Sequence, residues 1–209
     1  NPPRKGVQVV QLWHACGALK KVGYSTVDYK WEASLAALRK YKAYEATTMA
    51  VVSSDKIVGN YAEAFNLPDS MVHPFGIPRT DMFFDPVFVK NARSHIEEVF
   101  PEIGSRKILL YAPTFRGNSL NSAYAMKMLD YMLMKRYLGQ QYVIINKFHP
   151  LVAKKVKFNK VEEELYGDFV FDGSNRLNIN EALCAADILI TDYSTVMFEY
   201  ALLERPMIF

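Results

Sequence analysis

The chain has 209 residues, of which 50% are hydrophobic and 22% are charged, a composition typical of a globular protein that buries a core. Its net charge of +3 is too small to indicate a nucleic-acid-binding face, although it suits an anionic substrate or a weak attraction to anionic lipid. The two cysteines, Cys16 and Cys184, are too few and too far apart for a disulfide framework or a structural zinc site, and the apolar runs are too short to span a bilayer.

The first part of the chain alternates between strand and helix patterns. We predict a buried strand over residues 7–12, a helix over 30–44, a strand over 49–52 and a helix over 56–65. A basic loop with Lys20 and Lys21 follows the first strand, and Ser53, Ser54 and Asp55 can cap the second of these helices. The chain begins at Asn1 without a methionine and stops in what reads as a new strand, so we expect a longer protein, truncated here at both ends.

Residues 74–86 are rich in proline and glycine and show no helical periodicity. We interpret them as the passage between two lobes, residues 1–80 and residues 81–209. In the second lobe we predict helices over 87–99, 123–138, 180–186 and 195–204, and strands over 107–112, 142–146, 168–171, 188–191 and from Met207. Strands separated by helices indicate βαβ units, so the sequence predicts an α/β fold with parallel sheets covered by helices on both faces.

Three polar clusters each follow an apolar strand. They are Trp13-His14, the segment 147–150 (Lys-Phe-His-Pro) and the segment 191–195 (Thr-Asp-Tyr-Ser-Thr). Because ligands of open α/β sheets bind beyond the carboxyl ends of the strands, we expect these clusters to meet in one cleft. Their side chains suit a phosphate-bearing ligand, and so indicate an enzyme that handles a nucleotide.

Each cluster also has a structural interpretation. His14 can take a proton from an attacking hydroxyl, or it can be a core histidine bonded to a backbone carbonyl. Lys147 and His149 alternate along an extended segment and can hold a diphosphate, or they can be a surface lysine and a helix-capping histidine. Ser194 and Thr195 open a helix, where they can bind an anion or serve only as its N-cap.

Other polar residues are weaker candidates. Thr114 and Arg116 follow the strand 107–112, and the planar guanidinium matches phosphate oxygens. Arg79 and Asp81 lie in the passage between the lobes, where they can pair with each other and fix the orientation of the lobes. The methionines of the segment 123–138 recur at helical spacing and are interpreted as core residues: Met126, Met128, Met132 and Met134. We find no carboxylate pair that requires a metal.

Five motifs in order resemble one known family. They are QLWHACGALKKVGYS, HPFGIPRTDMF, ILLYAPTFRG, NKFHP and ITDYSTVMFEYALLERPMIF, and together they cover nearly the whole chain from about Val7 to Phe209. They resemble the CDP-glycerol glycerophosphotransferases, the teichoic acid primases and polymerases of bacterial walls. Members of that family extend beyond both ends of this chain.

The resemblance implies a GT-B-like fold of two Rossmann-like lobes. Residues 1–80 would be the C-terminal part of the acceptor-side lobe, and residues 81–209 an incomplete CDP-donor-binding lobe. The implied reaction moves glycerol phosphate, or a related polyol phosphate, from CDP-glycerol to a hydroxyl of a lipid-linked teichoic acid acceptor and releases CMP. The implied location is the cytoplasmic face of the bacterial cell membrane, peripheral to it, and neither a metal nor another cofactor is expected.

The resemblance also assigns roles. His14 matches the catalytic histidine of the family's Trp-His-Gly motif, in which this chain has Ala15 instead of glycine. Asp55 is expected to orient His14 or the acceptor. The donor diphosphate and nucleotide are expected at a larger set, namely Thr114, Arg116, Lys147, His149, Asp192, Ser194 and Thr195, where Thr195 replaces a serine usual in the family. Lys20, Arg79 and Asp81 are expected on the acceptor side or between the lobes.

Two alternatives remain at this stage. One is a sugar transferase or epimerase of the same architecture that uses a UDP-sugar. The other is an inactive fragment that binds nucleotide without turnover.

Overall fold

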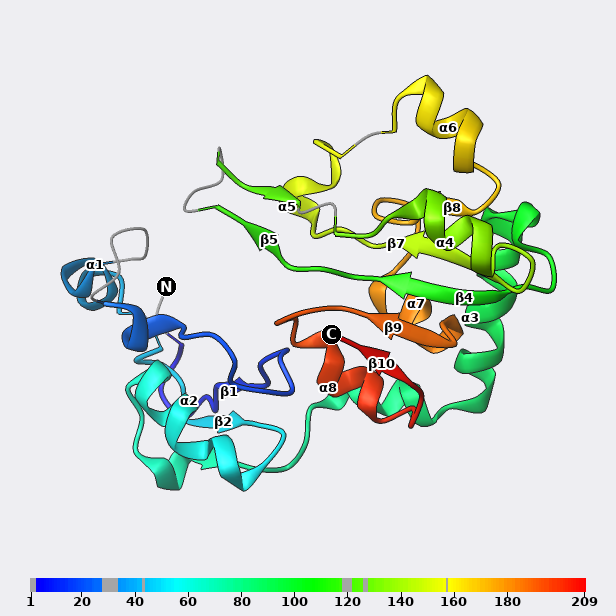
Figure 1. Ribbon diagram of the computed structural model, residues 1–209. Helices are drawn as coiled ribbons and strands as arrows, with labels where there is room; N and C mark the ends of the chain where they lie inside the picture. Colours follow the sequence, from blue (N-terminus) through cyan, green and yellow to red (C-terminus); the bar gives the residue numbers. More distant parts are fainter. Residues whose placement is uncertain (1–2, 28–33, 43, 118–121, 126–127, 157) are drawn as a thin grey trace. The chain divides into compact units, whose positions relative to one another are not determined.

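The structure is a computed structural model, and it describes residues 3–27, 34–42, 44–117, 122–125, 128–156 and 158–209 (Figure 1). The chain divides into two compact units, Asn1–Asp81 and Met82–Phe209. Each unit contains its own parallel sheet, which confirms the predicted α/β class. In the part of the chain that is described, no helix is both long and apolar enough to cross a membrane.

The first unit is built on a three-stranded parallel sheet in the order β1-β2-β3. Its strands are β1 (Val10–Gln11), β2 (Met49–Val51) and β3 (Val72–His73), and its helices are α1 (Leu35–Lys40), α2 (Val58–Phe65) and the 3-10 helices η1 (Gly23–Thr26), η2 (Asp55–Ile57) and η3 (Asp69–Met71). The core packs α2 against the sheet through Tyr61 and Phe65. Ser54 caps η2, because its Oγ accepts a hydrogen bond from the Lys56 N–H at 3.2 Å.

Three predictions for the first unit need correction. The strand over 7–12 is short and not buried, since Val10 is 42% exposed and β1 pairs on one side only. The helix over 30–44 is described only as α1, and residues 30–33 and 43 lie outside the described residues. The passage 74–86 is not free of helix, because Pro78, with its fixed φ, opens the 3-10 helix η4 (Pro78–Phe84).

The second unit contains a five-stranded parallel sheet in the order β10-β9-β4-β7-β8. Its strands are β4 (Lys107–Tyr111), β7 (Tyr142–Asn146), β8 (Val170–Asp172), β9 (Ile188–Ile190) and β10 (Met207–Ile208). The register places Leu110 beside Ile145 on one side and Leu189 on the other. All five strands lie close to their predicted positions.

Helices cover both faces of this sheet (Figure 1). They are α3 (Pro86–Val99), α7 (Ile179–Ala185) and α8 (Val196–Ala201) on one face, and α4 (Tyr131–Leu138), α5 (Pro150–Ala153) and α6 (Lys160–Tyr166) on the other; η5 (Pro101–Ile103) follows α3. Strand β4 shows the alternation directly, because Ile108 and Leu110 face the first layer while Leu109 and Tyr111 face the second. Both faces are buried, which explains the nearly continuous apolar run of the strand.

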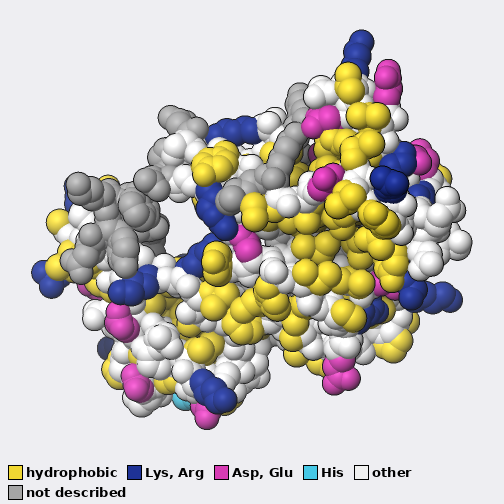
Figure 2. Space-filling model, in the orientation of Figure 1, with side chains coloured by type: hydrophobic (Ala, Val, Ile, Leu, Met, Phe, Trp, Pro, Cys, Tyr) yellow, Lys and Arg dark blue, Asp and Glu magenta, His cyan; other side chains and the backbone are white. Residues whose placement is uncertain are grey.

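The predicted helix over 123–138 is wrong in its first half. Residues Tyr124–Ala125 form β6, which pairs antiparallel with β5 (Phe115–Arg116), and α4 begins only after Asp130, whose side chain caps it. Two methionines predicted in the core are exposed, Met128 by 65% and Met132 by 47%, whereas Met134 packs on the core and Met126 lies outside the described residues. Figure 2 shows apolar side chains gathered on the surface over α4 and α6.

Other helices differ less from prediction. Helices α3 and α7 are confirmed. The helix over 195–204 is shorter than predicted, since α8 ends at Ala201. Helices α5 and α6 were not predicted, because a single short turn and a run of glutamates carry little apolar periodicity.

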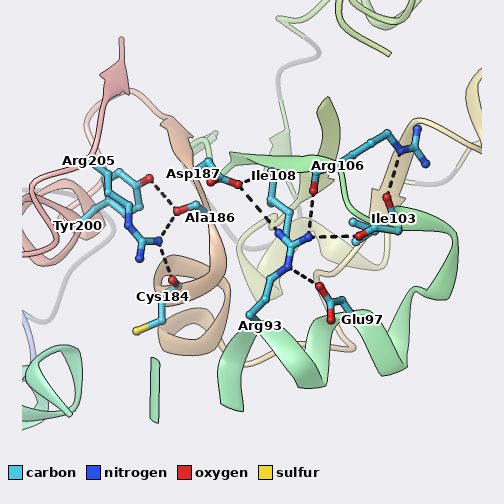
Figure 3. Close-up of polar contacts among 11 residues, drawn as sticks. Arg93, Glu97, Ile103, Arg106, Ile108, Cys184, Ala186, Asp187, Tyr200 and Arg205 are labelled. Carbon is cyan, nitrogen blue, oxygen red and sulfur yellow. Dashed lines mark hydrogen bonds and ion pairs between the residues drawn. The ribbon is translucent and has the colours of Figure 1, made fainter. Parts of the chain in front are cut away.

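The amino end of β9 is fastened to the start of β4 by Asp187 (Figure 3). Its Oδ2 accepts a hydrogen bond from the Ile108 N–H at 2.8 Å and lies 4.0 Å from Nη1 of Arg93. Arg93 in turn donates to the backbone carbonyls of Gly104 and Arg106. The carboxylate therefore joins β9, β4 and α3 at one point.

The carbonyls at the end of α7 are bound by one side chain from α8 and one from the segment after α8 (Figure 3). Nη1 of Arg205 donates to the carbonyls of Cys184 and Ala186 at 2.7 and 2.6 Å, and the Tyr200 hydroxyl donates to Ala186 at 3.1 Å. These bonds satisfy carbonyls that the helix end leaves without intrahelical partners. They also fix the start of β9.

We expect Asp187→Ala to lower the free energy of unfolding by about 1–3 kcal/mol, because the buried Ile108 N–H then has no acceptor. Asp168→Ala is the matched control. Its carboxylate is 67% exposed and pairs with Lys135 at the surface, so we expect a change within about 1 kcal/mol. Urea unfolding of both variants measures the difference, and equal effects would contradict the role given to Asp187.

Candidate functional site

The carboxyl edge of the second sheet contains a topological switch point between β4 and β9. The chain leaves β4 toward α4 on one face of the sheet, and it leaves β9 toward α8 on the other face. Neighbouring strands whose connections diverge in this way open a crevice beyond their carboxyl ends, where doubly wound folds bind nucleotides. The segments that follow β4 and β9 are those that contain Thr114, Arg116 and Asp192.

Asp192 joins these segments. Its Oδ1 accepts a hydrogen bond from the Thr114 N–H at 2.8 Å, and its Oδ2 accepts from the Thr114 hydroxyl at 2.8 Å and from Nη2 of Arg116 at 2.7 Å. Arg116 also donates to the Thr114 hydroxyl, and its guanidinium lies 5.7 Å from the centre of the Tyr193 ring. The structure thus brings three of the predicted donor-binding residues into one bonded group.

The charge of this group is set by competing effects on Asp192. Burial raises the pKa of its carboxyl, but the hydrogen bonds from the Thr114 N–H, from Arg116 and from the Thr114 hydroxyl outweigh burial and keep the pKa below its ordinary value. The carboxylate is therefore ionised at neutral pH and orients the guanidinium of Arg116. The Arg116 side chain is one-third exposed, so it can still contact a ligand.

The end of β7 lies beside this group. Nδ1 of His149 accepts from the Leu151 N–H at 3.3 Å, so His149 caps α5, as one of the two interpretations predicted. A neutral imidazole that accepts at Nδ1 has its proton on Nε2, which makes Nε2 a hydrogen-bond donor. The His149 ring lies 4.9 Å from the ring of Phe115, which directly precedes Arg116. The segments that follow β4 and β7 are therefore in contact.

Lys147 is anchored within the same edge. Its Nζ donates to the Ser174 carbonyl at 2.7 Å, and the Ser174 hydroxyl accepts from the Phe148 N–H at 3.0 Å. Burial lowers the pKa of Lys147, against an opposing effect of Asp172. The ammonium has three donors, so the bond to Ser174 leaves capacity for an anion.

The segment 191–195 differs in part from prediction. The Thr191 hydroxyl donates to the Ala112 carbonyl at 2.7 Å and is buried, so Thr191 fastens β9 to β4. Thr195 is the N-cap of α8 but makes no side-chain cap bond, and α8 has only 6 residues. Because the helix is short, its dipole adds less to anion binding at Ser194 than the sequence suggested.

A cavity of about 220 Å³ opens at the ends of β7 and β8. Its lining combines Phe148 and Phe158 with the buried amide of Asn146 and two carboxylates, Glu163 and Asp172. The Tyr131 hydroxyl donates to Oδ1 of Asn146 at 3.0 Å and fixes the orientation of the amide. An aromatic and acidic lining of this kind suits a flat ring that carries an amino group.

In the first unit, His14 lies on a loop that Trp13 fixes to the core. Trp13 has φ +47°, a left-handed conformation that is uncommon for a bulky residue. Its ring lies 4.5 Å from the His14 ring and packs against Tyr61 and Phe65 at 5.8 and 5.2 Å. His14 itself is exposed.

Three side chains bind three carbonyls of this loop. Nη2 of Arg79 donates to the His14 carbonyl at 2.9 Å, the Ser53 hydroxyl donates to the Cys16 carbonyl, and the Tyr61 hydroxyl donates to the Gly17 carbonyl at 2.9 Å. The three donors come from η4, from the end of β2 and from α2. The backbone that presents His14 is therefore fixed from three directions.

Sequence reasoning missed part of this arrangement. Ser53 could have been found, because a serine directly after a strand is a common loop anchor, but nothing marks Tyr61 as other than a core residue. Asp55 accepts from the Ser54 hydroxyl at 3.1 Å, and Asp55, Asp81 and Lys20 are all exposed. Their predicted roles, and the predicted meeting of His14 with His149, stay predictions.

Two further observations concern the Cys16 thiol and candidate metal sites. Burial raises the pKa of the Cys16 thiol more than the nearby Arg79 lowers it, so Cys16 is a protonated thiol at neutral pH. Among the described residues, no group of three or more His, Cys, Asp or Glu side chains is placed to hold a metal ion.

Comparison with known proteins agrees with this architecture. The model of the CDP-Glycerol:Poly(glycerophosphate) glycerophosphotransferase family matches residues 2–209. A teichoic acid poly(ribitol-phosphate) polymerase from Bacillus spizizenii is 40% identical over 99% of this chain and 32% of its own length, and a teichoic acid ribitol-phosphate primase from the same species is 38% identical over 100% and 52%. A teichoic acid glycerol-phosphate primase from Bacillus subtilis is 31% identical over 99% and 50%. The chain thus spans about half, or less, of the length of these relatives.

Solved structures show the same fold. The H444N variant of the wall teichoic acid polymerase TagF superimposes with a TM-score of 0.77 at 22% identity, over 98% of this chain and 50% of the polymerase. A TagF variant soaked with CDPG gives 0.75 at 21% over the same shares. A UDP-GlcNAc 2-epimerase from Neisseria meningitidis gives only 0.52 at 12%, over 89% of this chain and 49% of the epimerase. The predicted GT-B-like fold class is therefore confirmed.

We expect Asp192→Asn to lower the free energy of unfolding by about 1–2 kcal/mol at neutral pH, because charge-assisted hydrogen bonds to Thr114 and Arg116 are weakened. A carboxyl with a lowered pKa stabilises the fold above its ordinary value of 3.8, and that stabilisation is lost as the pH falls through the lower pKa of the folded state. The difference from the wild type should therefore shrink in acid. Urea unfolding across this pH range tests it, with the exposed Glu164→Gln as control; a difference independent of pH would contradict the assignment.

Proposed function

The chain belongs to the CDP-glycerol:poly(glycerophosphate) glycerophosphotransferase family, and from that premise we propose that it takes part in the transfer of a polyol phosphate from a CDP-activated donor to a hydroxyl of a teichoic acid acceptor, with release of CMP. The observation that carries this proposal is the bonded group of Asp192, Thr114 and Arg116 at the switch point between β4 and β9. It offers an oriented guanidinium where the fold class binds nucleotide phosphates.

In the proposed reaction the donor diphosphate binds along the carboxyl edge of the second sheet. Arg116, Nζ of Lys147 and Nε2 of His149 donate hydrogen bonds to its oxygens. Phosphoryl transfer asks a protein chiefly for positioning and for stabilisation of charge, and these three groups supply both. The cavity beside Phe148 and Phe158 suits the cytosine ring, whose exocyclic amine can donate to Asp172 or Glu163.

His14 is proposed to act on the acceptor. Its imidazole takes the proton of the acceptor hydroxyl as the oxygen forms a bond to the β-phosphorus of the donor. The bond from that phosphorus to the bridging oxygen breaks, and the electron pair leaves with CMP. Asp55 is proposed to orient His14 or the acceptor. Arg79 is proposed to position His14, because it donates a hydrogen bond to the His14 backbone carbonyl.

The donor is proposed to be CDP-ribitol rather than CDP-glycerol. The ribitol-phosphate polymerase and primase are more similar to this chain than the glycerol-phosphate primase is. We further propose that the reaction needs no metal and takes place peripherally at the cytoplasmic face of the membrane, where a lipid-linked acceptor is available.

A donor panel tests the function. The protein is incubated with a lipid-linked primer and CDP-ribitol, CDP-glycerol or a UDP-sugar, with and without a chelator. We expect CMP release with the CDP-polyols, fastest with CDP-ribitol, and no loss of rate with chelator. Turnover of the UDP-sugar would favour the epimerase or sugar transferase, and binding of CDP-polyol without turnover would favour the inactive fragment.

We expect His14→Ala to lower the rate of CMP release by roughly 10²–10⁴-fold, the usual contribution of a general base. Affinity for the CDP-polyol should be retained, because the proposed donor site lies on the second unit. Calorimetric titration and initial rates separate the two effects. His95→Ala, in α3, is the control, and normal turnover in His14→Ala would remove His14 from the role.

His149 is expected to affect donor binding instead. Since His149 also caps α5, His149→Asn is the informative variant: its side-chain oxygen can keep the cap while the imidazole donor is lost. We expect the Kd for the CDP-polyol to rise roughly tenfold, as for loss of one hydrogen bond to a charged group. Unchanged affinity would contradict the assignment.

A further inference from the structure

A hollow lies in the first unit between α2 and the loop that follows His14. The loop is fastened to α2 at two points. At one, the Tyr61 hydroxyl donates to the Gly17 carbonyl at 2.9 Å. At the other, Gly23 has φ +55° and approaches α2 so closely that a Cβ would lie 2.3 Å from the Ala64 carbonyl oxygen. The segment between these points, residues 18–22, is called the arch here, and together with α2 it lines a cavity of about 210 Å³.

The lining of this hollow is divided by polarity. Ala18, Val22 and Ala64 form an apolar part, which continues the hydrophobic core of the unit. Lys20 and Lys21 contribute two adjacent cationic side chains from the arch, and both residues are exposed. The lining of the cavity therefore has a positively charged part and an apolar part.

Helix α2 contributes groups of the opposite kind. Asn60 and Glu63 are three residues apart, so they lie on the same face of the helix, and both line the hollow. An amide and a carboxylate together can donate to and accept from hydroxyl groups. Such a site offers partners for an anion, for hydroxyls and for a short carbon chain.

This combination fits a polyol phosphate ester. One phosphodiester carries one negative charge, which the lysines can meet, while the polyol hydroxyls can bind Asn60 and Glu63 and the carbon chain can lie on the alanines. A cavity of about 210 Å³ is small for a nucleotide and suits a single polyol phosphate unit.

Two successive aromatic contacts connect the hollow to His14, the residue proposed as the base. Tyr61 lines it, and the Tyr61 ring lies 5.8 Å from Trp13, whose ring lies 4.5 Å from His14. We propose that this hollow binds one internal polyol phosphate unit of the acceptor chain, so that the terminal hydroxyl of the chain reaches His14. The proposal rests on the proposed function, because it takes its ligand from the acceptor of that reaction.

A glycerol phosphodiester has two sources in a bacterium, the polymer and the headgroup of phosphatidylglycerol. We assign the hollow to the polymer, since the arch and α2 enclose it on two sides as a small chain segment requires. The experiment separates the two sources.

The test follows the methyl groups of Ala18 and Ala64 by NMR in protein labelled at alanine. The probes are a soluble glycerol phosphate or ribitol phosphate oligomer and, separately, vesicles of phosphatidylglycerol or phosphatidylcholine. We expect the oligomer to shift both methyl signals. Lys20→Gln with Lys21→Gln should weaken that binding about tenfold, since two exposed ionic contacts contribute roughly threefold each, whereas Lys20→Arg with Lys21→Arg should retain it.

The matched control is Lys5→Gln with Lys40→Gln, which removes two exposed charges from the same unit and should leave the oligomer affinity as in the wild type. Equal weakening in the control, or an oligomer that does not shift the two methyl signals, would overturn the proposal. Shifts caused by phosphatidylglycerol vesicles but not by the oligomer would overturn the assignment to the polymer.

Steady-state kinetics provide an independent measurement. With the primer as acceptor, the lysine-to-glutamine pair should raise the acceptor KM relative to the donor KM, and the control pair should not. The methyl titration requires no turnover, so a protein that releases no CMP refutes the proposed function while the titration still decides the binding site. Normal kinetics for the acceptor in the lysine-to-glutamine pair would refute the hollow alone.

Discussion

Two aspartates fasten strand β9 to strand β4, one at each end. Asp187, just before β9, accepts from the Ile108 N–H near the start of β4. Asp192, after the end of β9, accepts from the Thr114 N–H after the end of β4. The candidate donor site depends on the second of these bonds, because the same carboxylate orients Arg116. Phe115, in the antiparallel pair of β5 and β6, also contacts the His149 ring. The contacts therefore connect the segment after β4 with the segment after β7.

The first unit uses a related solution for His14. Trp13 adopts a left-handed conformation while its ring packs against the core. Side chains from three elements then bind the carbonyls of the following residues. Because these carbonyls are fixed by hydrogen bonds rather than by regular secondary structure, the loop can present an exposed imidazole and still be ordered.

The same fastening creates the hollow beside α2. The loop is fastened at Gly17 and at Gly23, and between these points the arch contributes Lys20 and Lys21 to the lining of the hollow. If the hollow binds the acceptor, one set of bonds orients the base and shapes the neighbouring subsite. Binding and chemistry on the acceptor side would then share Tyr61.

The sequence by itself determined the parallel strands of the second unit, because runs such as KILLY and YVIIN are apolar on both faces and can only be buried between helices. It also placed Arg116, His149 and Asp192 after strand ends, and its ordered motifs indicated the family. Only the tertiary structure decided what those residues contact. Tyr124 and Ala125 form a strand because β5 lies beside them, and Tyr61 binds Gly17 although 44 residues separate them. Periodicity reports which face of an element is buried, whereas a hydrogen bond between distant residues depends on how the whole chain has packed.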